Sequence, residues 1–412
     1  MEPTANASFV AASLSQQGTG LAEMIAASDA ETPSGLIDLS IGDPDLACDP
    51  RVIEAAFQDA RAGYTHYADP YGDGELRGAI RLAWQQDYDV NVAPDELMVT
   101  ASATHAMALL LDAVLDPQDE AVVFSPFFTP YEAQIAHARG VCVEAPCSPE
   151  NGFIPTADLL RRALTKRTKA VILNNPNNPT GACMTQGQLQ ALVDVCRERH
   201  LLLIADEIYT SFSFFSPFCP IRWCEGSDEV CAVVRSFSKD YSMSGWRLGY
   251  VVAPTDVVRA MRAINESNVY VAPTPSQRAG LAAIGLRHEI RGHIHEVYGD
   301  RMRHALRRAR GLPGVSAPSS KGTLYLFLDV RETGMDDREF VSVMEREARV
   351  RLLSGSGFGA AGAGFCRMAL RCDIETLDAA FDAMGSALAQ KGSVVPFRAE
   401  ACRDARESAT GL

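Results

Sequence analysis

The stretch RSFSKDYSMSGWRLGY, residues 235–250, holds the two residues best suited to chemistry. Lys239 and Arg247 stand there among serines and glycines, shortly after the apolar run EVCAVV, which has the pattern of a buried strand. A lysine held at a site can act as a nucleophile toward a carbonyl group, whereas a lysine in an open loop only carries a solvated charge. The stretch alone leaves both interpretations open.

A carboxylate follows a second apolar run. LLLIA is followed by Asp206 and Glu207, and Tyr209 comes shortly afterwards. A carboxylate that ends a fully apolar strand is costly unless it has a charged or hydrogen-bonded partner. A helix N-cap is the alternative role for Asp206. The position nevertheless makes Asp206 a candidate site residue, with a phenol beside it.

Three more apolar runs end in polar or aromatic residues. ELMVT precedes Ser102, Ala103 and Thr104, which open a helix, so that two hydroxyls, free backbone N–H groups and a positive dipole end suit a phosphate. A plain N-cap would also explain them. AVVF precedes SPFFTPY, an aromatic stretch that includes Phe128. KAVIL precedes NNPNNPTG, a turn that aims asparagine side chains, although turn formation alone would explain it as well.

The elements that must position these residues alternate from about residue 95 to 255. Short apolar runs alternate with longer amphipathic stretches, and the continuous β-branched and leucine runs indicate strands covered on both faces. This alternation predicts a largely parallel α/β sheet. Ligands bind beyond the carboxyl ends of the strands in such sheets, so we expect the five strand ends to meet at one edge.

The pattern changes after about residue 290. A long basic helix candidate is followed by strands between helices, which predicts a second, smaller α+β domain. We expect residues 1–49 to form an N-terminal arm and part of the small domain, 50–290 the large domain, and 291–412 the small C-terminal domain.

One ligand uses all five strand ends, and it is pyridoxal 5′-phosphate (PLP). Its phosphate needs anion donors, its ring a flat apolar face, its ring nitrogen an acid, and its aldehyde a lysine. The chain resembles the class I/II aminotransferase family of fold-type I PLP enzymes from IDLSIGDPD to near residue 390. The motifs NNPNNPTG, ADEIY and SFSKDYSMSGWRLGY carry the resemblance. It implies a mostly parallel, seven-stranded type of sheet in a large domain, plus a smaller α+β domain.

The resemblance also implies a role for each cofactor-binding residue. Lys239 would form the Schiff base and shuttle the proton, and Asp206 would pair with the pyridine nitrogen. Asn178 and Tyr209 would hydrogen-bond the ring hydroxyl. Phe128 would stack on the ring, where many relatives carry Tyr or Trp. The phosphate would be held by Ser102, Ala103, Thr104, Ser236 and Arg247.

Substrate binding and assembly follow from the same resemblance. Arg367, in GFCRMALRC, would grip the substrate α-carboxylate together with Asn178, and Gly42, in SIGDP, would let that carboxylate approach the backbone. A bidentate guanidinium suits the task, but Arg371 competes for it, and a surface role is the alternative for either arginine. Tyr67 would reach the phosphate of a partner subunit, with Tyr64 as the alternative, which implies a homodimer with shared active sites.

The implied reaction is the transfer of an amino group between an L-amino acid and a 2-oxo acid, by a ping-pong mechanism through the Lys239 Schiff base. Another PLP reaction on an amino acid (β-elimination, cyclisation or oxidation) would use the same lysine and aspartate. The GWR triplet after Lys239 favours transamination over the C–S lyase branch. Phe127, Phe128 and Tyr270 favour a neutral or aromatic substrate.

Two other functions have weaker support. GFGAAG, residues 357–362, matches the GxGxxG pattern of dinucleotide-dependent oxidoreductases, but the following FCRMALR predicts a strand where that pattern requires a helix. The net charge of -14 argues against a protein that binds nucleic acid by broad electrostatics. Regulators that share the fold carry an N-terminal helix-turn-helix domain, and the short N-terminal arm leaves no room for one.

Cysteine usage and hydropathy predict a cytoplasmic protein. The eleven cysteines are scattered without a CxxC pair, as expected for reduced thiols, and the first twenty residues show no signal-peptide pattern. The longest apolar runs fall well short of a membrane span. No histidine lies near Cys219, Cys224 and Cys231, so we expect no metal site.

Overall fold

A computed structural model describes residues 33–318 and 320–392. The first 32 residues of the expected N-terminal arm, which include the stretch without a signal-peptide pattern, therefore lie outside the described residues. The end of the expected C-terminal domain, 393–412, lies outside them as well.

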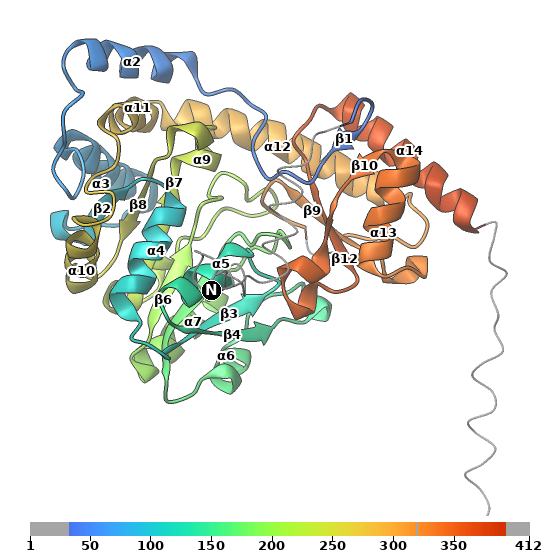
Figure 1. The fold of residues 1–412 in the computed structure, drawn as a ribbon, viewed down its shortest axis with the longest axis horizontal. Coiled ribbons are helices and arrows are strands. Elements are labelled where there is room, and N and C mark those ends of the chain that lie inside the picture. Colours follow the sequence, from blue (N-terminus) through green and yellow to red (C-terminus); the bar gives the residue numbers. More distant parts are fainter. Residues whose placement is uncertain (1–32, 319, 393–412) are drawn as a thin grey trace, which may run out of the picture.

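The centre of the molecule is a seven-stranded sheet with the strand order β2-β8-β7-β6-β5-β3-β4 (Figure 1). Only β8 runs antiparallel to its two neighbours, and the other neighbouring pairs are parallel. The predicted mostly parallel, seven-stranded sheet is thus confirmed. The strands are β2 (Leu97–Thr100), β3 (Glu120–Ser125), β4 (Val141–Pro146), β5 (Thr168–Asn174), β6 (Leu202–Asp206), β7 (Cys231–Ser236) and β8 (Gly249–Val252).

Helices cover both faces of this sheet, which explains the continuous apolar runs of its strands. Neighbouring residues of one strand belong to different cores: Val122 of β3 and Val233 of β7 lie in one, Val123 and Val234 in the other. The second core also takes side chains from α4 (Ala103–Val114), α5 (Pro130–His137) and α10 (Thr255–Asn265). Helices on the first core include α2 (Pro50–Arg61), α3 (Gly74–Tyr88), α6 (Ala157–Ala163), α7 (Gln186–Arg199) and α11 (Thr274–Gly285).

A smaller unit combines the start and the end of the described chain. β1 (Ile37–Asp38) pairs in parallel with β10 (Val350–Arg351), and an antiparallel sheet has the order β11-β12-β9. A separate core holds this unit together. Its other elements are β9 (Tyr325–Asp329), α13 (Asp337–Val343), β11 (Leu353–Ser354), β12 (Phe365–Ala369) and α14 (Ile374–Gly392).

One long helix, α12 (Arg287–Ala309), runs from the large sheet to the smaller unit (Figure 1). Ile290 and Ile294 lie in the core of the large sheet, whereas Met302 and Ala305, further along, lie in the core of the smaller unit. The expected boundary between residues 290 and 291 falls inside this helix. The exact domain limits stay a prediction.

Three further features of the described residues bear on the expected functions. GFGAAG lies in two short 3₁₀ segments, and β12 follows it, so the expected strand is present. No helix in the described part of the chain is long and apolar enough to cross a membrane. No group of three or more metal-ligating side chains occurs among residues 33–318 and 320–392.

A buried ion pair joins β7 to the residue that directly follows β6. Arg235 Nη2 lies 2.7 Å from Glu207 Oε2, and both side chains are buried. The Arg235 guanidinium also lies over the ring of Trp84, 4.1 Å from its centroid. Because desolvated charges are costly without a partner, removing either residue would leave the other without its opposite charge.

We expect Arg235→Met to lower the free energy of unfolding by about 3–5 kcal/mol, because it leaves the Glu207 carboxylate buried without its cation. Arg303→Met is the matched control. Its guanidinium lies 2.7 Å from Asp300 Oδ1 as well, but on the surface, so the change should stay within about 1 kcal/mol. Urea unfolding of both variants, followed by circular dichroism, measures the difference, and equal losses of stability would contradict the role of burial.

Candidate active site

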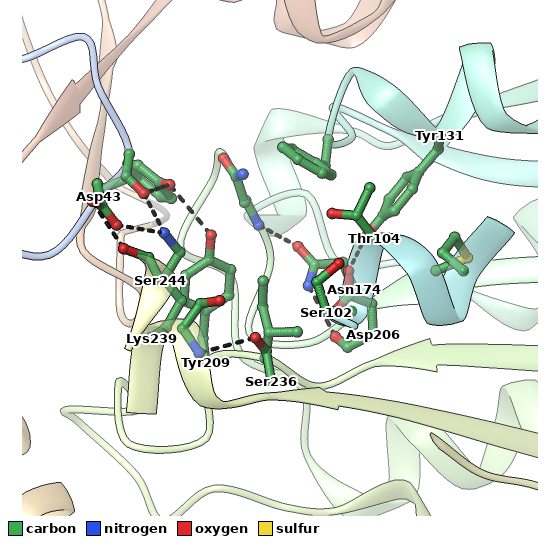
Figure 2. Close-up of a pocket in the computed structure, with 18 of the residues that line it drawn as sticks. Asp43, Ser102, Thr104, Tyr131, Asn174, Asp206, Tyr209, Ser236, Lys239 and Ser244 are labelled. Carbon is green, nitrogen blue, oxygen red and sulfur yellow. Dashed lines mark hydrogen bonds and ion pairs between the residues drawn. The ribbon is translucent and has the colours of Figure 1, made fainter. Parts of the chain in front are cut away.

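A cavity of about 320 Å³ lies at the carboxyl edge of the sheet (Figure 2). Its size suits a small ligand. Residues after β2, β3, β5, β6 and β7 line it, together with residues 40–43 and with side chains from the smaller unit. The cavity brings together twelve of the predicted site residues: Gly42, Ser102, Ala103, Thr104, Phe128, Asn178, Asp206, Tyr209, Ser236, Lys239, Arg247 and Arg367.

Lys239 lies in the short helix α9 (Phe237–Asp240), which follows β7 directly. Its Nζ donates to the carbonyl oxygen of Gly42 at 2.6 Å and lies 3.5 Å from Asp43 Oδ1. The next residue, Asp240, accepts hydrogen bonds from the Ser211 N–H at 2.9 Å and from the Thr210 hydroxyl. The turn that carries the lysine is thereby fixed to the segment after β6, and Lys239 is not a solvated loop charge.

Asp206 ends β6 and is buried at the cavity. Its Oδ2 accepts a hydrogen bond from the Tyr131 hydroxyl, whereas Oδ1 is buried and has no partner among the described residues. Burial raises the pKa of Asp206 to about 6, against the effect of the hydrogen bond from Tyr131. A buried carboxylate oxygen with no donor is an open position for an N–H group of a ligand.

Arg367 reaches the cavity from β12 of the smaller unit. Its Nη1 donates to Asn178 Oδ1 at 3.2 Å, and its Nη2 donates to the carbonyl oxygen of Ser40 at 2.6 Å. The guanidinium lies over the ring of Tyr325, 4.4 Å from its centroid, and burial lowers the pKa of Arg367. Of the two competing arginines, Arg367 lines the cavity and Arg371 does not.

Two tyrosine hydroxyls meet beside Arg367. The hydroxyl of Tyr209 lies 3.3 Å from that of Tyr325, which in turn donates to the carbonyl oxygen of Gly42 at 3.4 Å. Burial, together with the neighbouring Tyr325 hydroxyl, raises the pKa of Tyr209 well above its ordinary value. Tyr209 is therefore a neutral hydrogen-bonding group at neutral pH.

The cavity also presents donors suited to an anion. Ser102 is the N-cap of α4, and its Oγ accepts from the His105 N–H at 3.1 Å. The first N–H groups of a helix have no acceptor within the helix. β8 passes so close that a Cβ on Gly249 would lie 2.7 Å from the nitrogen of Ala103. The Arg247 side chain lines the same cavity, with Nη1 bonded to the Ser244 carbonyl oxygen at 2.8 Å.

Tyr67 is the one predicted site residue that lies outside the cavity. Its side chain is 83% exposed, and its ring meets the edge of Tyr270 at 5.1 Å between centroids. Tyr64 does not line the cavity either, and the Arg278 guanidinium lies over its ring. Of the three aromatic residues expected near the substrate, Phe128 lines the cavity, whereas Phe127 and Tyr270 do not.

The structure adds three residues that the sequence did not single out. Tyr131 belongs to the aromatic stretch SPFFTPY, but nothing there distinguishes the ring that contacts Asp206. Asn174 ends β5, accepts from the Asn178 N–H at 2.6 Å and donates to the Asp206 carbonyl oxygen at 2.9 Å. Its place as a polar residue ending an apolar run is the signal that could have found it. Tyr325 comes from a distant strand and has no local signal.

Comparisons with known proteins agree with this architecture. The family model for aminotransferase class I and II matches residues 34–384. An aspartate/prephenate aminotransferase of Thermus thermophilus is 34% identical over 337 residues, which are 79% of this chain and 85% of the relative. An aromatic-amino-acid aminotransferase 2 of Thermococcus litoralis is 32% identical over 366 residues, 87% of this chain and 92% of the relative.

Solved structures give the same result. The crystal structure of an aspartate aminotransferase from Thermotoga maritima matches with a TM-score of 0.86 and 30% identity, over 92% of this chain and 100% of that one. The match of the family model over most of the chain, the identity with these relatives and the common fold are mutually consistent. The chain belongs to the class I and II aminotransferases, PLP-dependent enzymes of fold-type I.

Proposed function

We propose that the cavity at the carboxyl edge of the sheet binds PLP, and that Lys239 is the residue that bonds to it. The observation that carries the proposal is the buried, unpartnered Oδ1 of Asp206. It lies in the same cavity as Lys239 and as the anion donors at Ser102, Ala103 and Arg247. Around this site, the enzyme moves an amino group between an L-amino acid and a 2-oxo acid.

The residues present fit the chemical groups of PLP. Asp206 Oδ1 would accept from the protonated ring nitrogen, and Asn178 and Tyr209 would hydrogen-bond the ring hydroxyl. Phe128 offers an aromatic face to the ring. The phosphate would be held by Ser102, Ala103, Thr104, Ser236 and Arg247, at the N-terminus of α4 and beside it.

The protein's part in the reaction is to hold charges and move one proton. When bound, PLP supplies an aldehyde that links to amines and a ring that withdraws electrons from the substrate α-carbon. Nζ of Lys239 takes the α-proton as a positioned general base and later returns it. Asp206 stays ionised beside a cation, because an opposite charge in contact lowers the pKa of a buried carboxyl group.

Arg367, Asn178 and Gly42 would bind the substrate α-carboxylate. A guanidinium offers two parallel N–H donors to a carboxylate, and the ring of Tyr325 fixes its plane in the free protein. Its present acceptors are the neutral oxygens of Asn178 and Ser40. A substrate carboxylate would give this buried cation the negative partner that it lacks among these contacts.

Single-turnover experiments test the reaction type. An amino acid mixed with the PLP-loaded enzyme should convert the near-visible absorption band to that of the pyridoxamine form, with a 2-oxo acid as product. We expect Lys239→Ala to slow this conversion by about 10²–10⁴-fold, because it removes the positioned base, while the far-UV circular dichroism stays unchanged. Borohydride reduction should fix the cofactor on Lys239 in the wild type.

Lys166→Ala, at an exposed lysine, serves as the control and should leave turnover unchanged. Retained turnover in Lys239→Ala would refute the assignment of the lysine. Release of ammonia or sulfide in the wild type would instead identify a different PLP reaction, such as β-elimination.

We expect Arg367→Lys to raise KM for the amino acid by about 10–100-fold, because lysine cannot form the bidentate pair with a carboxylate. Arg371→Lys is the matched control and should change KM by less than about twofold. Steady-state kinetics at saturating 2-oxo acid gives both values. A large rise in KM for Arg371→Lys alone would assign the carboxylate to Arg371.

We further propose a homodimer in which Tyr67 completes the phosphate site of the partner subunit. The exposure of Tyr67 and of the neighbouring Tyr270 supports this, because exposed aromatic residues are enriched at interfaces. Ile53 and Phe57 of α2 are exposed as well. We also propose a cytoplasmic location, supported by the ten described cysteines, whose thiols are all free.

Mixing of two impaired variants tests the shared site. Tyr67→Ala should weaken cofactor binding by about tenfold, which is the loss of one charge-assisted hydrogen bond. Equal amounts of Tyr67→Ala and Lys239→Ala subunits, reassociated at limiting cofactor, should regain about a quarter of wild-type activity. Half of the dimers are then hybrids, and each hybrid has one complete site. No gain on mixing would show that Tyr67 does not act across an interface.

A further inference from the structure

Tyr131 contacts both of the groups that the proposed site places against the pyridine ring. It is the second residue of α5, after β3, and its side chain is buried. Its hydroxyl donates to Asp206 Oδ2 (Figure 2). Its ring meets that of Phe128 edge to face, with 5.5 Å between the centroids and an angle of 82° between the planes. One side chain thus supports the acid and the aromatic face together.

The hydrogen bond fixes which oxygen of Asp206 is free. Oδ2 is occupied by the Tyr131 hydroxyl, and Oδ1 is the buried oxygen with no partner among the described residues. The backbone of Asp206 is held as well, since its carbonyl oxygen accepts from Asn174 Nδ2 at 2.9 Å and from the Asn175 N–H at 3.1 Å. The carboxylate therefore cannot rotate without breaking the contact with Tyr131.

We propose that Tyr131 is a positioning residue, which holds Asp206 so that one carboxylate oxygen meets the pyridine nitrogen and which keeps that nitrogen protonated. The proposal rests on the proposed function, in which Asp206 pairs with this nitrogen. Tyr131 holds Asp206 through Oδ2, which leaves Oδ1 for the cofactor.

The electrostatics around Asp206 favour a neutral donor at this place. Burial raises the pKa of Asp206, the hydrogen bond from Tyr131 and the Ile208 N–H lower it, and the charge of Glu207 raises it again. Without the phenol, the carboxylate would hold a proton more strongly and would compete for the one on the ring nitrogen. Tyr209 also faces Asp206, and its hydroxyl is neutral at working pH.

A tyrosine suits this position because it stays protonated. Burial and the neighbouring Asp206 raise the pKa of Tyr131 well above its ordinary value. The hydroxyl therefore donates over the whole working range of pH and adds no positive charge. A cationic donor there would stabilise Asp206 too, but it would oppose a second positive charge on the ring nitrogen across the same carboxylate.

The test uses PLP labelled with ¹⁵N in the ring, bound to the wild type and to Tyr131→Phe, because the ¹⁵N chemical shift reports the protonation of the nitrogen. Phenylalanine keeps the ring contact with Phe128 and removes only the hydroxyl. We expect a protonated nitrogen in the wild type and a resonance displaced toward the unprotonated position in the variant. The single-turnover rate should fall by about 10–100-fold, the effect of one hydrogen bond to a charged group.

Tyr298→Phe is the matched control. Tyr298 is also buried and its hydroxyl also donates to an aspartate, Asp45 Oδ1 at 2.8 Å, but it does not line the cavity. This variant should leave the ¹⁵N resonance unchanged. Tyr131→Leu should displace the resonance as Tyr131→Phe does and should also weaken cofactor binding, because it removes the ring that supports Phe128.

The outcomes separate the two proposals. A protonated nitrogen in the wild type that stays equally protonated in Tyr131→Phe and Tyr131→Leu overturns the role of Tyr131 and leaves that of Asp206 intact. An unprotonated nitrogen in the wild type overturns the pairing with Asp206, and the role of Tyr131 with it. An equal displacement in Tyr298→Phe would show that the effect is a general loss of packing, and it too would overturn the proposal.

Discussion

A carboxylate at the end of an apolar strand is stable only where donors or cations reach it, and two such carboxylates stand side by side at the end of β6. Glu207 has a cationic partner in Arg235, at 2.7 Å, and also accepts from the Ile221 N–H. Asp206 has no cation beside it: its Oδ2 accepts from a neutral phenol, and its Oδ1 has no partner among the described residues. The first pair stabilises the sheet edge, whereas the second leaves a buried acceptor for a ligand. Asp206 accordingly lines the cavity, whereas Glu207 does not.

The remaining walls come from parts of the chain that are far apart in sequence. Arg367 and Tyr325 belong to the antiparallel sheet of the smaller unit, whereas Asn178 and Tyr209 belong to loops of the large one. Ser40 and Gly42 lie between them and accept from Arg367 and Lys239 through backbone carbonyl oxygens. The half of the site proposed for the substrate therefore exists only while both units are packed together.

The sequence was most informative where a polar or reactive residue directly follows an apolar run. Five apolar runs located strands of the sheet, and the polar or aromatic residues after them predicted the contents of the cavity, because parallel strands end at the same edge. Tyr131 could not be chosen from SPFFTPY, since the sequence does not show which of the three aromatic rings contacts Asp206 at the end of β6. Tyr325 could not be found at all, because the continuous apolar run of β9, YLFL, carries no mark of the partner across the interface. Similarly, only the fold shows that Arg367 rather than Arg371 lines the cavity.

Helix α12 has a mechanical consequence. It contributes to the core of the large sheet near its N-terminus and to the core of the smaller unit further along. At the junction, Arg301 Nη1 and the Tyr298 hydroxyl both bind Asp45 Oδ1, at 2.6 and 2.8 Å. Asp45 lies three residues after Gly42. A rotation of the smaller unit would have to tilt or bend helix α12. Because the helix binds Asp45, the movement would reach the nearby carbonyl oxygen of Gly42, to which Lys239 donates. The helix thereby links the packing of the smaller unit to the backbone contact of Lys239, the lysine proposed to bond the cofactor.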